Sequence, residues 1–538
     1  MFAQQIPHVI PLLVILLVFV VALAVFAERL KTPYPIVLVI GGLIISQIPH
    51  LPQFRLNPNI VFLVILPPLI FSGAFLTSWR DFRYHLSSIL LLAFGLVIFT
   101  VFGIGLVAHT MLPGFDWRTG LVLGAVVSPT DPVAAISIAK RLGLPKHVTD
   151  LIEGESLVND ATGLLALQFA TGLVVTQHIP TASEGALRFL YLVFGSIAIG
   201  LVLGRIIHEV EKRIANAPIE ILISLMAPYF AYLGAEEAHA SGVMATVACG
   251  LYLGHRSSAY FSIDARLQAA AVWNTLIFVL NGIVFILIGL QLPYIRSGIT
   301  GLSVGTLLGL GLLFSAIVIA LRLMWMYPAA GLVNWLEKMR RRPRTEFPNR
   351  RYVFLVGWTG MRGVLALAAA FALPEMVESG RPFPQRNAVI FLTFSVIFVT
   401  LVLQGLTLPM IIRRLGLAGV PEEDPEELEA RRVISKAALN YLEDARQNSD
   451  PAFGSLYDEL ERRQRRRLTE LSPEPDGEQN EPLETYQHLI GIAHEMRTVQ
   501  RAALQRMHRE NKINDEAFRK LEHELDLLEA RLPSTGHL

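Results

Sequence analysis

Long apolar runs are the feature that most constrains this chain. Runs of about 17–25 residues recur from the N-terminus to about Arg413, and a helix of that length crosses the ~30 Å hydrocarbon core of a bilayer. Composition agrees, because 53% of the 538 residues are hydrophobic and only 17% are charged, whereas about a quarter are charged in an ordinary soluble domain. The sequence therefore predicts an all-α polytopic membrane protein.

The runs predict about thirteen transmembrane helices. An odd number of crossings would place the two termini on opposite sides of the membrane. The approximate spans are 9–26, 34–50, 60–77, 86–112, 118–139, 149–177, 187–208, 218–235, 241–254, 267–292, 300–336, 352–373 and 387–415.

The distribution of basic residues predicts the orientation of these spans. With the N-terminus outside, the cytoplasmic loops hold roughly nineteen Lys and Arg residues and the outer loops hold about five. We therefore expect a multi-pass protein of the cell (inner) membrane with its N-terminus outside and its C-terminus cytoplasmic. The first run, Val9–Phe26, is long for a signal peptide and follows no basic segment, so it is expected to remain as a helix.

The chain is predicted to divide into a transmembrane domain, 1–415, and a cytoplasmic helical tail, 416–538. The tail is highly charged, and apolar residues recur at helical spacing in 428–445 and 515–532. A solvated helical tail is the simplest interpretation, and a regulatory role is the alternative. The single cysteine, Cys249, excludes an intrachain disulfide.

Away from the ends of the predicted spans, five ionisable residues stand out: Asp131, Glu155, Asp160, Arg322 and Arg362. Charged side chains are costly in hydrocarbon and usually mark function. Asp131, Asp160 and Arg362 each lie about 15–19 Å along their helices, at 1.5 Å per residue. That depth is near the bilayer midplane, where transporter sites are found. Arg322 is expected to extend to the inner surface from near the end of its run.

The stretch SPTDPVAAIS, which begins at Ser128, places two prolines within the fifth span. Pro129 and Pro132 have no N–H to donate, so the helix is expected to break there. The freed carbonyls must be buried in protein or line a wet cavity, and with the Thr130 hydroxyl they are suitable oxygen ligands for a small cation. A kink needed only for packing is the alternative, but it leaves Asp131 unexplained.

The stretch EGESLVNDATGLL, Glu153–Leu165, places polar groups on one face of the sixth span. Ser156 and Asp160 share one edge of the helix, and Glu155 and Asn159 share the neighbouring edge. A cluster of interhelical hydrogen bonds is the alternative interpretation, although two acids exceed what packing needs.

The stretch GWTGMRGVLALA, Gly357–Ala368, combines three glycines with an arginine in the twelfth span. The glycines permit close approach of another backbone. Arg362 stays charged and needs a carboxylate partner, for which Glu155 and Asp131 are the candidates. A purely structural ion pair remains open.

Together these three segments resemble the sodium/proton exchanger family of monovalent cation:proton antiporters. The resemblance covers about Val9 to Arg413, and the tail carries no matching motif. It implies a thirteen-helix fold of two inverted six-helix repeats around a linking helix. Two broken helices, here the fifth and twelfth spans, would cross near mid-membrane. It also implies a homodimer and an elevator-like movement of a core domain.

The resemblance also implies roles for the polar residues. Asp160 would bind both the cation and the proton, and Glu155 and Arg362 would form a core salt bridge. The pair Asn159–Asp160 matches the electroneutral branch, which exchanges one cation for one proton. The ion- and proton-binding residues would be Asp160, Asn159, Ser156, Thr130 and Asp131, with Asp160, Thr130 and Ser156 as Na⁺ ligands and Asp131 arranging the crossing.

The predicted function is secondary active exchange of Na⁺ or Li⁺ for H⁺, in the service of pH homeostasis. K⁺/H⁺ exchange on the same scaffold and a cation channel are alternatives. An intramembrane aspartyl protease would use Asp131 and Asp160, but one lies between prolines and the other follows an asparagine. No enzymatic activity, cofactor or nucleic acid is expected. The expected partners are monovalent cations, protons, the bilayer and a second copy of the chain.

Overall fold

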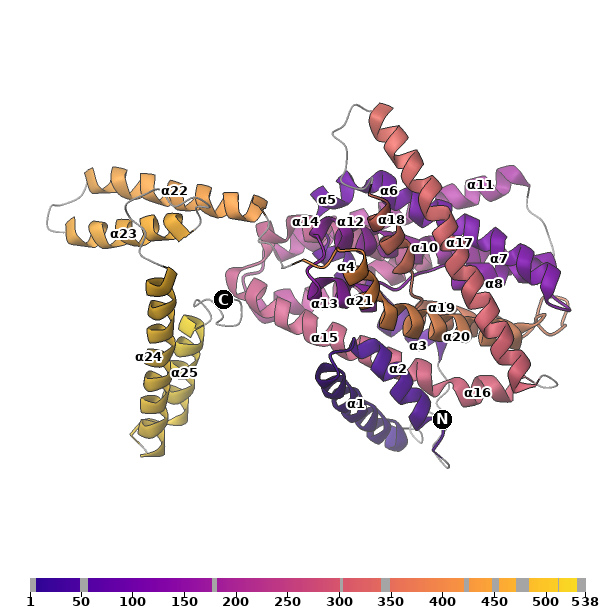
Figure 1. Cartoon of the computed structure of the whole chain (residues 1–538), viewed down its shortest axis with the longest axis horizontal. Coiled ribbons are helices and arrows are strands. Elements are labelled where there is room, and N and C mark those ends of the chain that lie inside the picture. Colours follow the sequence, from indigo (N-terminus) through magenta and orange to yellow (C-terminus); the bar gives the residue numbers. More distant parts are fainter. Residues whose placement is uncertain are drawn as a thin grey trace. The chain divides into compact units, whose positions relative to one another are not determined.

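The computed structural model describes residues 6–48, 57–176, 181–299, 303–339, 349–419, 425–447, 454–470, 483–510 and 512–529. These ranges are almost entirely helical and contain no β-strand (Figure 1). Contacts between residues divide the chain into two compact units, Met1–Glu422 and Glu423–Leu538. The first unit holds every predicted span, and the second holds the charged tail.

The first unit is a bundle of helices, several of which contain a π-helical segment, at Val61–Ile65, Leu91–Leu96, Tyr191–Gly195 and Thr400–Gln404. In chain order its helices are α1 (Ile6–Arg29), α2 (Tyr34–Ile45), α3 (Pro58–Ile60), α4 (Leu66–Leu76), α5 (Trp79–Tyr84), α6 (Leu86–Leu90), α7 (Val97–Met111), α8 (Trp117–Val127), α9 (Val133–Arg141), α10 (Lys146–Val175), α11 (Ala182–Leu190), α12 (Ser196–Glu211), α13 (Ala217–Glu237), α14 (Gly242–Tyr260), α15 (Ile263–Leu290), α16 (Leu292–Ser297), α17 (Val304–Met339), α18 (Arg350–Trp358), α19 (Val364–Phe371), α20 (Arg386–Val399) and α21 (Gly405–Arg414).

Each of the thirteen predicted spans coincides with a helix or with a pair of consecutive helices. Within the described residues, eight helical segments are long and apolar enough to cross a membrane, and shorter apolar helices include α2 and α8. The all-helical membrane architecture is thus confirmed, while the number of crossings stays a prediction. The eight segments are Pro58–Leu76, Leu86–Met111, Lys146–Val175, Ser183–Glu211, Ala217–Glu237, Ile263–Ser297, Gly305–Leu336 and Arg386–Arg414.

The fifth span is broken, as its prolines predicted, and the twelfth is broken, as the family resemblance implied. The fifth consists of α8 and α9, separated by the non-helical Ser128–Pro132 that contains both prolines. The twelfth consists of α18 and α19, separated by Thr359–Gly363. Prolines remove the donors that would continue the first helix, and the glycines of the second break favour non-helical backbone.

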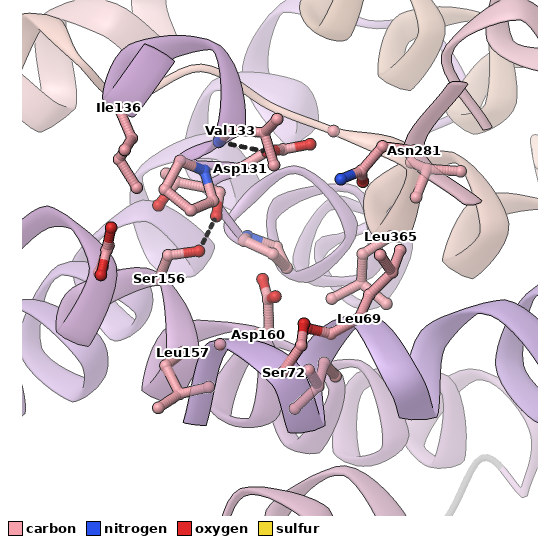
Figure 2. Close-up of a pocket in the computed structure, with 18 of the residues that line it drawn as sticks. Leu69, Ser72, Asp131, Val133, Ile136, Ser156, Leu157, Asp160, Asn281 and Leu365 are labelled. Carbon is pink, nitrogen blue, oxygen red and sulfur yellow. Dashed lines mark hydrogen bonds between the residues drawn. The ribbon is translucent and has the colours of Figure 1, made fainter. Parts of the chain in front are cut away.

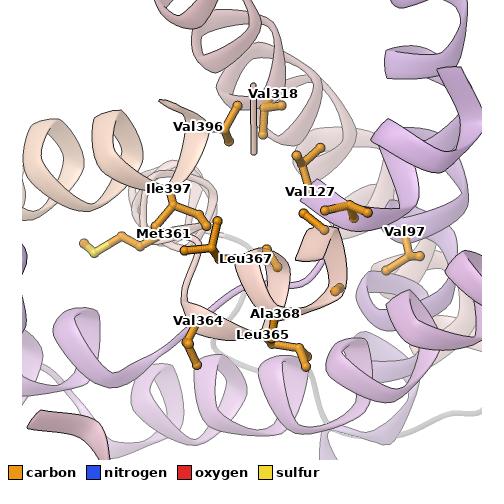
Figure 3. Close-up of a cluster of buried hydrophobic side chains, with 14 of the residues drawn as sticks. Val97, Val127, Val318, Met361, Val364, Leu365, Leu367, Ala368, Val396 and Ile397 are labelled. Atoms are coloured by element: carbon orange, nitrogen blue, oxygen red, sulfur yellow. The ribbon is translucent and has the colours of Figure 1, made fainter. Parts of the chain in front are cut away.

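Apolar side chains pack around the two breaks. Val127, at the end of α8, lies with Met361, Leu367 and Ile397 in a buried cluster that Figure 3 shows beside the break. Each of these four side chains is at most 1% exposed. One side of the breaks is therefore covered by buried apolar side chains.

The second unit consists of two pairs of helices. The first pair, α22 (Pro425–Gln447) and α23 (Gly454–Glu470), is joined by surface ion pairs such as Arg446–Asp458 at 2.9 Å. The second pair, α24 (Leu483–Arg509) and α25 (Asp515–Glu529), is joined by Arg501–Asp526 at 2.9 Å. The helical character of the tail is as predicted, and its function stays open.

Candidate ion-binding site

The two breaks touch at their centres. The backbone N–H of Asp131, in the first break, donates to the carbonyl oxygen of Met361, in the second, at 2.8 Å. Gly363 lies against the same aspartate, and a Cβ atom there would be 2.0 Å from Asp131 Oδ2. Only glycine leaves room for this approach. The closely spaced glycines were expected to admit another backbone, but the atoms nearest to Gly357, Gly360 and Gly363 belong to side chains.

Asp131 also begins the second half of the fifth span. Its Oδ1 accepts a hydrogen bond from the Val133 N–H at 2.9 Å, at the start of α9. A carboxylate is favourable at a helix N-terminus because the first N–H groups are unpaired and carry partial positive charge. The side chain is therefore engaged in holding the break.

Arg362 closes the other side of the first break. Its Nε donates to the carbonyl oxygen of Val127, the last residue of α8, at 3.0 Å, and its Nη1 donates to the Gly360 carbonyl. Its backbone N–H donates to Thr400 Oγ1 at 3.2 Å. The guanidinium thus places positive charge at the C-terminus of α8, where carbonyl groups lack helical donors.

The predicted salt bridge between Glu155 and Arg362 is wrong in this structure. The partner of Glu155 is Arg322: Nη2 of the arginine lies 2.8 Å from Oε2 of the glutamate, and Nη1 lies 2.5 Å from Oε1. Both side chains are 1% exposed. A two-pronged pair of this kind suits the planar guanidinium.

The expectation that Arg322 extends to the inner surface is wrong for the same reason. It lies in the middle of α17, and its guanidinium also donates to the carbonyls of Val356 and Gly357, each at 3.1 Å, at the end of α18. Its side chain passes over Gly360, where a Cβ would lie 2.2 Å from Arg322 Cδ. The glycine makes room for an arginine from another helix, which the sequence could not reveal.

Hydrogen bonds join the first break to α10. Ser156 Oγ donates to the Thr130 carbonyl at 2.7 Å, and Asn159 Nδ2 donates to Thr130 Oγ1 at 2.6 Å. The Thr130 N–H donates in turn to Asn159 Oδ1 at 3.3 Å. Three of the predicted site residues therefore form one buried cluster.

Asp160 faces a cavity of about 420 Å³ beside this cluster. Figure 2 shows its carboxylate projecting from α10 toward the space between Ser156 and Asn281. No hydrogen bond to this carboxylate occurs within the part of the chain that the structure describes. The cavity wall continues to Glu153, whose side chain is 33% exposed. The oxygens of Asp160 are thus available to a ligand from the cavity.

Two polar wall residues were missed by the sequence reasoning. Asn281 of α15 and Ser72 of α4 both line the cavity and are 6% and 7% exposed. Tyr34, at the start of α2, lines the same cavity as Asn281. An uncharged polar residue in an apolar run carries little signal, because it can equally pack between helices.

The cavity offers oxygen ligands for a hard cation. Asp131, Asp160, Thr130 and Ser156 contribute to its wall, and carboxylate, hydroxyl and carbonyl oxygens suit hard cations. Among the described residues, no group of three or more His, Cys, Asp or Glu residues could hold a metal ion.

The fold and the site define a class of protein. Discontinuous helices whose half-helix ends meet around buried polar groups, inside a helical membrane bundle, are typical of secondary transporters. Comparison with known proteins then identifies the family: residues 14–414 match the family described as "Sodium/hydrogen exchanger, transmembrane". The chain belongs to this family of cation/proton antiporters, which are transporters and not enzymes.

Individual relatives and a solved structure agree with this family assignment. An uncharacterised Na⁺/H⁺ exchanger of Mycobacterium tuberculosis is 31% identical over 97% of this chain and 95% of the relative. A sodium, potassium, lithium and rubidium/H⁺ antiporter of Bacillus subtilis is 31% identical over 80% of this chain and 66% of the relative. The solved sodium/proton antiporter MjNhaP1 of Methanocaldococcus jannaschii shares the fold, with a TM-score of 0.60, 20% identity, and coverage of 77% of this chain and 100% of that structure.

Proposed function

We propose that this protein exchanges Na⁺ or Li⁺ for H⁺ across the cell membrane, one for one, with Asp160 as the shared binding site. The observation that supports this most directly is the half-buried Asp160 carboxylate, which faces the cavity and accepts no hydrogen bond from any residue that the structure describes. Removing water from a carboxylate disfavours its charged form. A proton or a cation can each relieve that cost, so the two compete for the same oxygens.

Competition at one site is sufficient for exchange. A carboxylate that carries a proton or a monovalent cation is close to neutral, and an empty one is charged. Moving an uncompensated charge through low dielectric is costly, so only the occupied site would cross readily. In this proposal Thr130, Ser156 and Asn159 complete the cation site, with Thr130 and Ser156 as Na⁺ ligands beside Asp160.

We also propose how the molecule moves and how it is placed. The crossed broken helices would belong to a core that moves against a dimer-forming domain in an elevator-like cycle. The protein would be a homodimer, with the N-terminus outside and the C-terminus cytoplasmic. The asymmetry of basic loop residues supports the orientation. The bond from Asp131 to Met361, which joins the two breaks, supports a core that moves as one body.

Exchange of K⁺ for H⁺ is the second candidate. The Bacillus subtilis relative transports sodium, potassium, lithium and rubidium according to its name, so a broad cation range is compatible with the family. Rates measured with Na⁺, Li⁺, K⁺ and Rb⁺ in the same vesicles would separate a sodium-selective protein from a broad one.

The test of the shared site is Asp160→Asn in proteoliposomes that contain a trapped pH dye. We expect sodium-driven proton movement to be abolished, because an amide cannot bind and release the proton. Asp264→Asn is the matched control, since Asp264 is exposed in the first turn of α15, and it should retain wild-type flux. Retention of flux in Asp160→Asn would contradict the proposal, and single-channel currents without a proton gradient would favour a channel.

A further inference from the structure

A second pair of acids is buried away from the transport cavity. Glu211 is the last residue of α12, and Glu220 lies in the first turn of α13. Their side chains are 1% and 0% exposed, and neither lines the cavity that contains Asp160. They interact electrostatically with each other. Two buried acids in a membrane-spanning bundle require a physical explanation.

Glu220 occupies a position that favours a negative charge. Its Oε2 accepts a hydrogen bond at 2.9 Å from the N–H of Ser262, the residue that caps the N-terminus of α15. It also lies at the N-terminal end of its own helix. Both helix ends present partial positive charge, so Glu220 is the better placed of the two acids to carry a negative charge, although its Oε1 has no hydrogen-bond partner among the described residues.

Glu211 lies where a negative charge is unfavourable. It lies at the C-terminus of α12, where the helix presents partial negative charge. Neither of its carboxyl oxygens has a hydrogen-bond partner within the described ranges. Ile207, one helical turn before Glu211 on α12, and Leu253 of α14 are buried apolar side chains of the same cluster and offer the carboxyl group no hydrogen bond. A charge on Glu211 would be uncompensated, and a proton removes that cost.

The neighbouring groups do not supply a compensating cation. Among the salt bridges between described residues, none involves Glu211 or Glu220; Lys212 pairs with Glu209 at 3.6 Å, and the Arg256 guanidinium lies 4.9 Å from the Tyr252 ring centre. Cys249 and Tyr260 of α14 interact electrostatically with Glu211. Buried His208, one turn earlier on α12, is surrounded by Arg205, Glu209, Lys212 and Arg256, and Asp264 and Arg266 follow Ser262 at the start of α15. The Nδ1 atom of buried His208 also has no partner in the described part of the chain.

We propose that Glu211 and Glu220 form a second proton-binding site, which holds one proton on Glu211 beside an ionised Glu220. Two neighbouring buried carboxylates cannot both ionise readily, and the helix ends decide which of them keeps the proton. The ligand proposed for this site is a proton, which relieves the charge on Glu211 directly.

The site is packed onto one wall of the transport cavity. Helix α14, which contacts both α12 and α13, also packs against α4. A Cβ on Gly254 of α14 would be 2.2 Å from the Phe75 carbonyl of α4, so the two backbones touch. Ser72 of α4 lines the cavity. Loss of the Glu211 proton would place two negative charges at the α12–α13 junction and strain this packing.

Infrared difference spectra of the purified full chain in lipid, recorded between acidic and alkaline pH, test the proposal. The carboxylic-acid carbonyl band reports protonated acids directly. We expect Glu211→Gln to remove one such band. We expect Glu220→Gln to retain this band at acidic pH. The band should then be lost at a lower pH than in the wild type, because the negative charge of Glu220 no longer disfavours deprotonation of Glu211. Glu209→Gln is the matched control on the same helix and should leave the spectrum as in the wild type.

The infrared test does not depend on transport activity. The same loss should appear when Glu211→Gln is placed in the Asp160→Asn background, so a failure of the exchange proposal leaves this test valid. If wild type and Glu211→Gln show the same bands, the proposal is overturned. If Glu211→Gln does not fold, an unchanged titration in Glu220→Gln overturns it equally.

Discussion

Glu155 and Arg322 bury two opposite charges inside the bundle, and both side chains are 1% exposed. The arginine also caps the end of α18 through the Val356 and Gly357 carbonyls. Removing one partner of a buried pair leaves the other charge uncompensated, which typically costs about 3–5 kcal/mol.

We therefore expect Arg322→Gln to lower the stability of the folded protein by about 3–5 kcal/mol, measured by thermal unfolding in detergent. Arg381→Gln, at an exposed position, is the control and should change little. Equal unfolding temperatures for the two variants would show that the Glu155–Arg322 pair does not hold the core.

A second prediction at the scale of one residue concerns competition between sodium and protons at Asp160. If protons and sodium compete for its carboxylate, the sodium concentration for half-maximal exchange must rise as the pH falls. On the acidic side the rise should approach about tenfold per pH unit, as for any ligand that displaces one proton. Exchange rates measured over a range of sodium concentrations at several pH values check this. A half-maximal concentration that does not change with pH would exclude a shared site.

At the scale of elements, charged side chains contact the ends of the four half-helices in a consistent pattern: an acid at the N-terminal ends and arginines at the C-terminal ends. Asp131 is bonded to the start of α9 and lies against Gly363, just before α19. Arg362 and Arg322 donate to the ends of α8 and α18. Each charge therefore opposes the partial charge of the helix end it meets, which stabilises two breaks that would otherwise leave polar backbone unpaired.

This pattern predicts different roles for the two aspartates. Asp131→Asn keeps an acceptor for the Val133 N–H but removes the charge, so we expect a loss of about 0.5–2 kcal/mol in stability with sodium-driven proton flux still measurable. Asp160→Asn should fold normally and show no flux. Thermal unfolding and flux assays on both variants decide between these roles. Loss of flux in a fully stable Asp131→Asn protein would mean that Asp131 carries the proton.

The broken helices could be predicted because their causes are local. Pro129 and Pro132 remove donors from their own helix, and Gly363 provides the space that its contact with Asp131 needs. The partner of Glu155 could not be predicted, because two arginines were available and packing chose between them. Asn281 was missed since its role depends on α15 lying beside the cavity, which the sequence of α15 does not show.

At the scale of the whole molecule, the cavity belongs to one unit of the chain. All of its lining residues lie between Tyr34 and Ala366, and the tail forms a separate compact unit from Glu423. We therefore expect a protein truncated after Val420 to keep the same order of rates for Na⁺, Li⁺ and K⁺. Proteoliposome assays with each cation, on full-length and truncated protein, measure this. A changed order would show that the tail influences cation choice, and a changed pH profile alone would assign it a regulatory role.

The hydrogen bond between Asp131 and the Met361 carbonyl ties the two broken helices together at their midpoints. If the core moves across the membrane during transport, the hydrogen-bonded crossing of the two broken helices moves with it unchanged. A cation arriving from either face would then meet the same oxygens at the same spacing. The protein should consequently rank sodium, lithium and potassium identically from the two sides of the membrane, whatever the difference in rate between import and export.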